Sequence, residues 1–136
     1  MFDRLLIATD GSDCARRAAK CGIELADVYG ADVHVVSVYR GDDAHGRAAL
    51  DEIADLAADA GVAVDTELLS GKPAKSIVDY ADQTGADLVV VGRRGRSGVR
   101  ERLLGSITER VLRRSGPPVL TVSGSEMSAD TGTAYG

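Results

Sequence analysis

Glycine, serine and arginine gather in one short stretch of the chain, GRRGRSGVRERLLGSIT, at residues 92–108. Glycine lets the backbone turn tightly and approach a ligand closely, and arginine can donate paired hydrogen bonds to a phosphate. These residue types therefore indicate a site for an anionic ligand, although a solvated loop whose arginines pair with nearby carboxylates would have the same composition. The residues concerned are Gly92, Gly95, Gly105 and Ser106 with the arginines Arg93, Arg94, Arg96, Arg100 and Arg102.

The serine of this stretch stands where a helix is expected to begin. Ser106 and Glu109 have the Ser-x-x-Glu spacing of a capping box, which predicts that the Ser106 side chain caps the fourth helix of the chain. The free N–H groups of a helix N-terminus attract an anion by about 0.3–1 kcal/mol. The spacing leaves both a phosphate site and a simple helix cap open.

A second turn of chemical interest follows the first apolar run. Asp10 precedes Gly11 and Ser12, in a context that is common for turns and helix caps and that also suits contact with a ligand. Two familiar phosphate motifs are excluded. Residues 70–73, SGKP, lack the earlier glycine and the Ser or Thr of a Walker loop. The glycines at 92 and 95 follow the fourth strand, and no acidic residue follows on another strand about twenty positions later, as a dinucleotide motif requires.

These residues need a framework, and apolar runs alternate with helical periodicity along the chain. Continuous apolar strands alternating with helices predict a parallel sheet covered by helices on both faces. Right-handed crossovers require the strand order to reverse, and ligands of such sheets bind beyond the strand C-termini at the reversal. If the first and fourth strands are neighbours there, both turns face one crevice. Strands are expected near residues 5–8, 33–38, 62–69, 88–91 and 118–122, and helices near 14–28, 50–57, 73–81 and 106–115.

The first helix is expected to end at Gly30 and to bury residues at helical spacing. Its two cysteines lie roughly 10 Å apart along the helix axis, too far for a disulfide, so both are expected to be buried thiols. His34 and His45 stand apart from any set of residues with metal-ligand spacing, and no zinc site is expected. The predicted buried face of the helix is Cys14, Ala18, Cys21, Leu25 and Val28.

Composition limits the function classes. The formal net charge of the 136 residues is -5, which argues against general nucleic-acid binding because phosphate backbones attract basic faces. No apolar run approaches the roughly 18 residues of a membrane span, and no leader opens the chain, so we expect a cytoplasmic protein. The acid is mostly Asp and the base mostly Arg, which indicates a halophilic origin or GC-rich coding. A domain at residues 1–123 is expected to precede a flexible tail at 124–136.

Several motifs match in order, spacing and identity, and together they make the chain resemble the universal stress protein family from Phe2 to about Ser123. The resemblance implies an adenine nucleotide alpha hydrolase-like, Rossmann-like α/β sandwich whose five parallel strands have the order 3-2-1-4-5. It also implies a homodimer that pairs the last strand, Val119, Leu120, Thr121 and Val122, and an open apolar edge strand invites such pairing. The matching segments are residues 2–12, 35–38, 71–77, 86–92, 103–111 and 118–120.

The ATP-binding branch of this family has the motif G-x2-G-x9-G-(S/T), which Gly92, Gly95, Gly105 and Ser106 match. The resemblance implies that Asp10 holds the adenosine end of the nucleotide, that the Val38 backbone meets the adenine edge, and that Gly92 lies by the ribose. The phosphates would then meet backbone or hydroxyl groups of Gly95, Gly105, Ser106 and Ile107. The expected ligand is ATP, or AMP or ADP, with Mg²⁺. The expected contact residues are Ala8, Thr9, Asp10, Val38, Val91, Gly92, Arg94, Gly95, Gly105, Ser106 and Ile107.

Three features depart from the family pattern. Ala8 stands where many members have proline, Arg93 and Arg94 make the loop unusually basic, and the connection at residues 39–45 is short. We therefore expect a looser adenine wall, a different phosphate number or affinity, and a less covered nucleotide.

Three functions follow from these expectations. The first is a nucleotide-binding stress-response or signalling module that dimerises. The second is a slow ATPase, but hydrolysis needs a group that positions water. The carboxylates near the glycine stretch are Glu101 and Glu109, and Glu109 has the expected capping role. The third is an interaction protein without ligand, against which the intact glycine motif argues. We expect binding rather than turnover and assign no catalytic or metal-binding residue.

Overall fold

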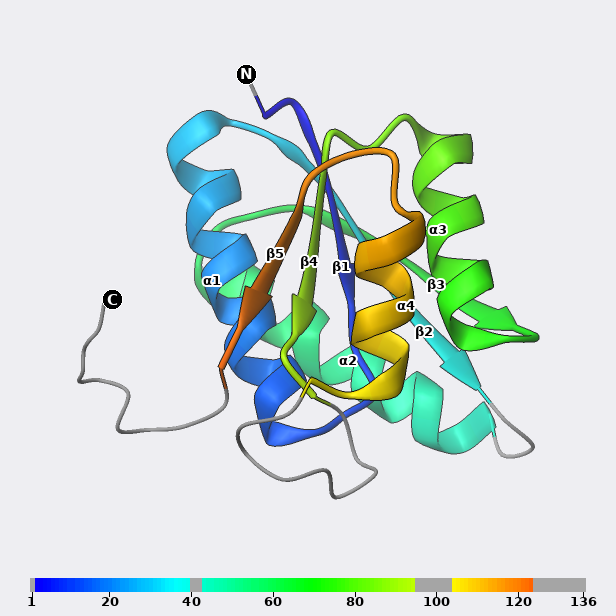
Figure 1. The fold of residues 1–136 in the computed structure, drawn as a ribbon. Helices are drawn as coiled ribbons and strands as arrows, with labels where there is room; N and C mark the ends of the chain where they lie inside the picture. Colours follow the sequence, from blue (N-terminus) through cyan, green and yellow to red (C-terminus); the bar gives the residue numbers. More distant parts are fainter. Residues whose placement is uncertain (1, 40–42, 95–103, 124–136) are drawn as a thin grey trace.

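The computed structural model describes residues 2–39, 43–94 and 104–123. Within them, five parallel strands form one sheet in the predicted order, β3-β2-β1-β4-β5 (Figure 1). The predicted tail at 124–136 and the predicted ligand residue Gly95 lie outside the described residues. The strands are β1 (Arg4–Ala8), β2 (Asp32–Tyr39), β3 (Val64–Ser70), β4 (Leu88–Gly92) and β5 (Val119–Val122).

Helices cover both faces of the sheet, as predicted (Figure 1). α1 and α2 pack over the face that carries Leu5 and Ile7 of β1, and α3 and α4 pack over the face that carries Leu6 and Ala8. Successive side chains of a strand point to opposite faces, so this two-sided cover buries β1 from Leu5 onward. The helices are α1 (Asp13–Tyr29), α2 (Asp43–Asp59), α3 (Pro73–Thr84) and α4 (Ser106–Arg114). None of the helices in these ranges combines the length and apolar character that crossing a membrane requires.

Small residues set the face that α1 turns to the sheet. Ala18 and Ala19 are fully buried, and a Cβ placed on Gly22 would lie 2.9 Å from Ile7 Cδ1. The predicted buried face is therefore wrong at one end, because Val28 is 78% exposed. Alanine and glycine carry little apolar signal in a sequence, yet they let a helix lie close to a sheet. For that reason the predicted buried face of α1 is offset from the face that packs on the sheet.

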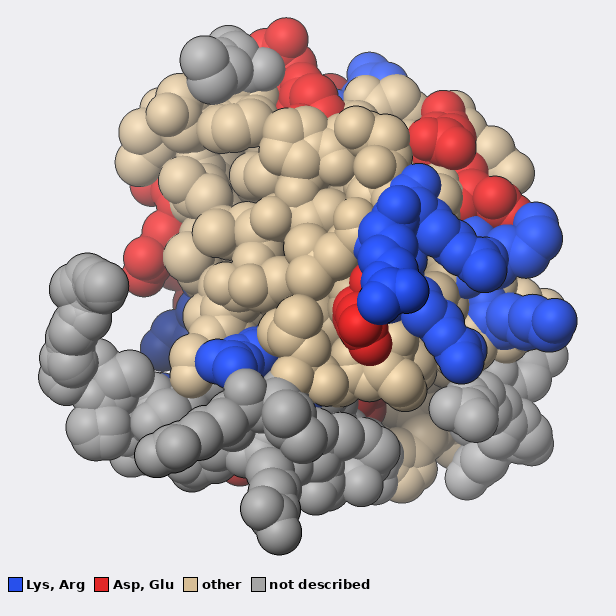
Figure 2. Space-filling model, viewed as in Figure 1, with Lys and Arg blue, Asp and Glu red and all other residues tan. Residues whose placement is uncertain are grey.

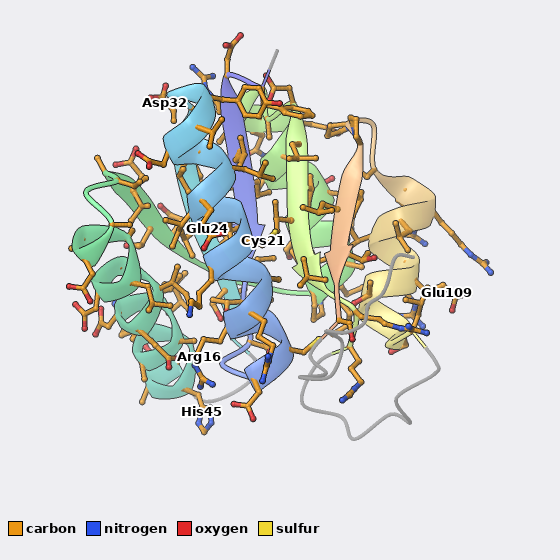
Figure 3. All side chains as sticks on the ribbon, turned by 90° about the vertical axis from the view of Figure 1, so that its left-hand side faces the viewer. Arg16, Cys21, Glu24, Asp32, His45 and Glu109 are labelled. Atoms are coloured by element: carbon orange, nitrogen blue, oxygen red, sulfur yellow. The ribbon has the colours of Figure 1, made fainter. Side chains whose placement is uncertain are left out.

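The two cysteines of α1 have different surroundings, and both are free thiols. Cys14 is buried and donates its S–H to the Val122 carbonyl oxygen at 3.3 Å. Cys21 is half-buried rather than buried as predicted, and Figure 3 shows it on α1 above Arg16. Burial raises the pKa of the Cys21 thiol, and the Glu24 carboxylate adds to the effect. A raised pKa disfavours the thiolate form of Cys21.

Two helix ends, at Gly30 and Pro73, follow the predicted signals, and the start of α1 has a serine cap that was not predicted. The Ser12 hydroxyl accepts a hydrogen bond from the Ala15 N–H at 3.1 Å at the start of α1. Gly30 ends that helix in the left-handed region, with a φ of 66°. Pro73 opens α3, where a missing N–H costs nothing.

The start of α4 differs from its prediction. The N-cap is Gly105, no side chain caps the helix, and Ser106 is its first residue. The predicted capping box is therefore wrong, and the Glu109 carboxylate instead accepts a hydrogen bond from Arg113 at 2.9 Å. The reason is tertiary: the Gly105 N–H donates to the Arg93 carbonyl oxygen at 3.0 Å, which fixes where the helix begins.

Candidate functional site

A cavity of about 640 Å³ lies at the carboxyl ends of the central strands. Thr9 follows β1, Val38 lies near the end of β2 and Gly92 ends β4, and all three line the cavity. β1 pairs with β2 on one side and with β4 on the other, so the cavity lies at the reversal of strand order. The crevice predicted from the alternation of strands and helices is in this place.

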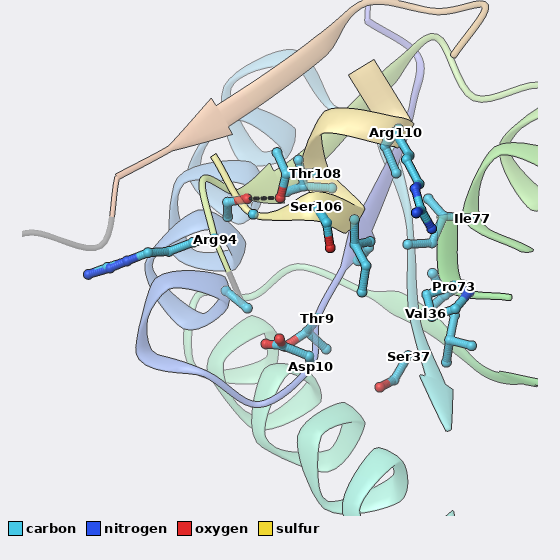
Figure 4. Close-up of a pocket in the computed structure, with 18 of the residues that line it drawn as sticks. Thr9, Asp10, Val36, Ser37, Pro73, Ile77, Arg94, Ser106, Thr108 and Arg110 are labelled. Carbon is cyan, nitrogen blue, oxygen red and sulfur yellow. Dashed lines mark hydrogen bonds between the residues drawn. The ribbon is translucent and has the colours of Figure 1, made fainter. Parts of the chain in front are cut away.

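The first turns of all four helices in the described part of the chain reach this cavity. Ala15 lies in the first turn of α1 and His45 in that of α2, and both line the cavity. Pro73, which begins α3, and Ser106, which begins α4, line it as well (Figure 4). Each helix N-terminus carries a partial positive charge and N–H groups without a partner inside the helix. The first turns that line the cavity therefore favour a negatively charged ligand.

The structure gathers the predicted contact residues around this one cavity. They come from three strand ends and from the start of α4, although they are up to a hundred positions apart in sequence. Gly95 alone among them cannot be placed, since it lies outside the described ranges. The predicted residues that line the cavity are Ala8, Thr9, Asp10, Val38, Val91, Gly92, Arg94, Gly105, Ser106 and Ile107.

Asp10 is held in place by the turn that contains it. Its Oδ1 accepts a hydrogen bond from the Ser12 N–H at 2.9 Å. The Thr9 hydroxyl accepts one from the Gly11 N–H at 3.2 Å, and Gly11 has a φ of 82° in the left-handed region. The Asp10 carboxylate thus serves the turn, and Asp10 also lines the cavity, so its contact with a ligand stays a prediction.

The beginning of α4 is fixed to the end of β4. Buried Thr108 donates its hydroxyl hydrogen bond to the Gly92 carbonyl oxygen at 2.8 Å (Figure 4). The Arg93 N–H donates to the Val122 carbonyl oxygen at 2.8 Å, which extends the same attachment to β5. Ser106 is exposed beside this buried anchor. Its hydroxyl therefore faces the cavity from a rigid base.

Two arginines line the cavity in different ways. Figure 4 shows Arg94 extending away from Ser106, whereas Arg110 lies alongside Ile77. Arg96, Arg100 and Arg102 are outside the described residues.

The predictions missed a second group of lining residues. Most of them come from the helices, whose positions over the sheet are set by packing rather than by local sequence. Arg110 had a signal, because it follows Ser106 by four positions and so shares its helix face. The additional lining residues are Ala15, Val36, Ser37, His45, Gly46, Pro73, Ile77, Thr108, Arg110 and Val111.

An ion-pair cluster joins α1 to α2 at the end of the molecule where His45 lies (Figure 3). Arg16 pairs with Asp13 on its own helix and with Glu52 on α2. Hydrogen bonding to Glu52, and then to Asp13, raises the pKa of the Arg16 guanidinium. Since the three side chains are partly exposed, the cluster contributes modestly to stability, but it ties together the two helices whose first turns line the cavity.

An open parallel α/β sheet with helices on both faces and a cavity at the reversal of strand order is the architecture of proteins that bind small anionic ligands at that edge. The family model of the universal stress protein family matches residues 1–123, and the chain belongs to this family.

Individual relatives agree. A universal stress protein of Methanocaldococcus jannaschii is 36% identical over 140 residues, which cover 90% of this chain and 82% of that protein. A universal stress protein crystallised in complex with cAMP has a TM-score of 0.77 and 31% identity, covering 91% of this chain and 99% of that one. A universal stress protein from Archaeoglobus fulgidus has a TM-score of 0.80 and 26% identity, covering 90% and 100%.

Proposed function

We propose that this chain binds an adenine nucleotide, ATP foremost, in the cavity at the carboxyl edge of the sheet. The observation that carries the proposal is that first-turn residues of four described helices line a space of about 640 Å³. That volume suits a ligand of nucleotide size, and the helix ends suit its phosphates. The relative that is 31% identical was crystallised in complex with cAMP, which supports the ligand class.

The two ends of the cavity suit the two ends of a nucleotide. Val36 and Val38 offer an apolar wall on which a purine ring can lie. The start of α4 offers N–H groups and the Ser106 hydroxyl to phosphates. In this proposal Asp10, Ala8 and Thr9 contact the adenosine end, and Val91 and Gly92 lie by the ribose. The proposed phosphate residues are Gly95, Gly105, Ser106 and Ile107, with Arg94 adding charge.

Mg²⁺ accompanies ATP in this proposal. No group of three or more His, Cys, Asp or Glu side chains that could hold a metal ion occurs among the described residues. The phosphate oxygens of the nucleotide would therefore supply most of the ligands of the ion, as is common for Mg²⁺.

We further propose a binding module for stress response or signalling, which works as a homodimer in the cytoplasm. Its acidic composition, with a net charge of -5, suits a salt-rich interior. A slow ATPase is the second candidate, and one observation favours it. His45 lines the cavity and could position or deprotonate a water molecule. Phosphate release that His45→Ala abolishes while ATP still binds would establish hydrolysis.

The binding proposal has a direct test. Denaturing the purified protein and identifying any released nucleotide shows which ligand it carries. ATP with Mg²⁺ should raise the melting temperature, because ligand at 100 times its dissociation constant adds about 2.7 kcal/mol to the free energy of unfolding.

Gly105→Val should abolish that shift, since a branched side chain at the N-cap of α4 fills the space beside Ser106. The melting temperature of the variant without ligand reports whether its fold is intact. No shift of the wild-type protein at millimolar ATP would refute the proposal. Normal binding by Gly105→Val would show that the phosphates lie elsewhere.

A further inference from the structure

Arg110 lies on the same face of α4 as Ser106, one turn further along. Four residues of α-helix rise about 6 Å, a distance that an arginine side chain covers. Side chains on a helix lean toward its N-terminus, so the Arg110 side chain lies over the turn that begins with Ser106. Both residues line the cavity, and Figure 4 shows both side chains directed to the same side of α4.

The charge of Arg110 is uncompensated within the described chain. Its side chain has no hydrogen bond or ion pair with any described residue. Glu109 pairs with Arg113 at 2.9 Å, and Asp79 pairs with Lys75 at 2.7 Å. A guanidinium without a partner at the wall of a cavity is available to an anionic ligand.

We propose that Arg110 is a specificity-determining residue of this site, which contacts the phosphate of the bound nucleotide and so distinguishes nucleotides from nucleosides. The inference rests on the proposed function. It places an arginine of α4 beside the phosphate group, in addition to the arginines of the 92–108 stretch that lie before this helix in the sequence. Its five N–H donors can bind two phosphate oxygens at once, while the Ser106 hydroxyl and the first N–H groups of α4 bind others.

Calorimetric titration of adenosine, AMP and ATP into wild-type protein and Arg110→Gln tests this proposal. We expect the variant to bind AMP and ATP roughly five- to tenfold more weakly and to bind adenosine within about twofold of wild type. Arg110→Lys should recover part of the loss, because it restores the charge without the paired donors. The loss should shrink at high salt, since the side chain is exposed.

Arg114→Gln is the matched control. Arg114 is exposed on the same helix, one turn beyond Arg110, and does not line the cavity. Removing its charge should leave all three affinities unchanged. Equal losses for adenosine and ATP in Arg110→Gln, or no loss for ATP, would overturn the inference while leaving nucleotide binding intact. Failure of the wild-type protein to bind any of the three ligands would instead refute the proposed function.

Discussion

At the scale of single residues, Gly92 shows that a motif glycine can be required by the protein's own packing. A Cβ at this position would lie 3.0 Å from Ala15 N and from Cys14 C, and both are backbone atoms. The end of β4 therefore approaches the start of α1 as closely as a glycine allows. The spacing of glycines indicates a ligand loop, and at its first position there is also a structural requirement that spacing cannot reveal.

We expect Gly92→Ala to lower the free energy of unfolding by about 1–3 kcal/mol, because the added methyl group must push β4 and α1 apart. Denaturant unfolding followed by circular dichroism measures the loss. Gly116→Ala is the control, since a Cβ there has its nearest contact, Asp82 Oδ1, at 3.8 Å. If the two variants were equally stable, the close approach of β4 to α1 would not be the constraint described here.

At the scale of elements, the serines at the starts of α1 and α4 have different roles. The Ser12 hydroxyl accepts a hydrogen bond from the backbone of α1, whereas Ser106 makes no cap on α4. Ser12→Ala should therefore cost about 1 kcal/mol of stability. Ser106→Ala should change the free energy of unfolding by less than about 0.5 kcal/mol and should weaken ATP binding.

Denaturant unfolding of both variants, together with the ATP-induced shift in melting temperature, separates these two roles. The ordering of the two stability losses is the decisive quantity. A loss in Ser106→Ala as large as that in Ser12→Ala would mean that Ser106 serves α4 after all. If ATP raised the melting temperature of Ser106→Ala as much as that of wild type, the Ser106 hydroxyl would not contact the phosphates.

The helices and strands are predictable where their signals are local. Gly30 ends α1 and Pro73 opens α3 because each residue fixes the backbone by its own covalent structure. The start of α4 is not predictable in this way, since it depends on the hydrogen bond from the Gly105 N–H to the Arg93 carbonyl oxygen, formed across a stretch of chain. The predicted buried face of α1 is offset because alanine and glycine, which carry little apolar signal in a sequence, are the residues that meet the sheet.

At the scale of the whole molecule, topology explains how much of the site is predictable. Turns that follow parallel strands meet at one edge of the sheet, so Asp10 and Gly92 lie close together once β1 and β4 are neighbours, as the resemblance implies and the structure has them. His45 and Arg110 are missed because α2 and α4 reach the cavity only through their packing on opposite faces of the sheet. Alternation along the chain predicts a parallel sheet and the edge where a ligand binds, whereas the strand order is implied by the family resemblance. The approach of helix side chains to a cavity is not encoded in that alternation.

The remaining feature at this scale is the edge of the sheet formed by β5. Figure 2, in the view of Figure 1, shows a broad area without charged side chains over β5 and its surroundings. Leu112 on α4, the helix that follows β4 and precedes β5, is 38% exposed. An apolar edge strand invites pairing with a second strand, and apolar surface beside it adds to the contact. The half-buried residues of this strand are Val119, Leu120, Thr121 and Val122.

We expect a homodimer in solution that pairs β5 of two copies, and light scattering at micromolar concentration should give twice the mass of one chain. Leu112→Glu should weaken the dimer at least about tenfold, because association would bury a carboxylate without a partner. Val28→Glu is the control, since Val28 is 78% exposed on α1, a helix that packs on the other face of the sheet from α4. A monomeric wild-type protein would refute the prediction. A dimer weakened equally by both variants would show that the two copies meet through a surface other than the β5 edge.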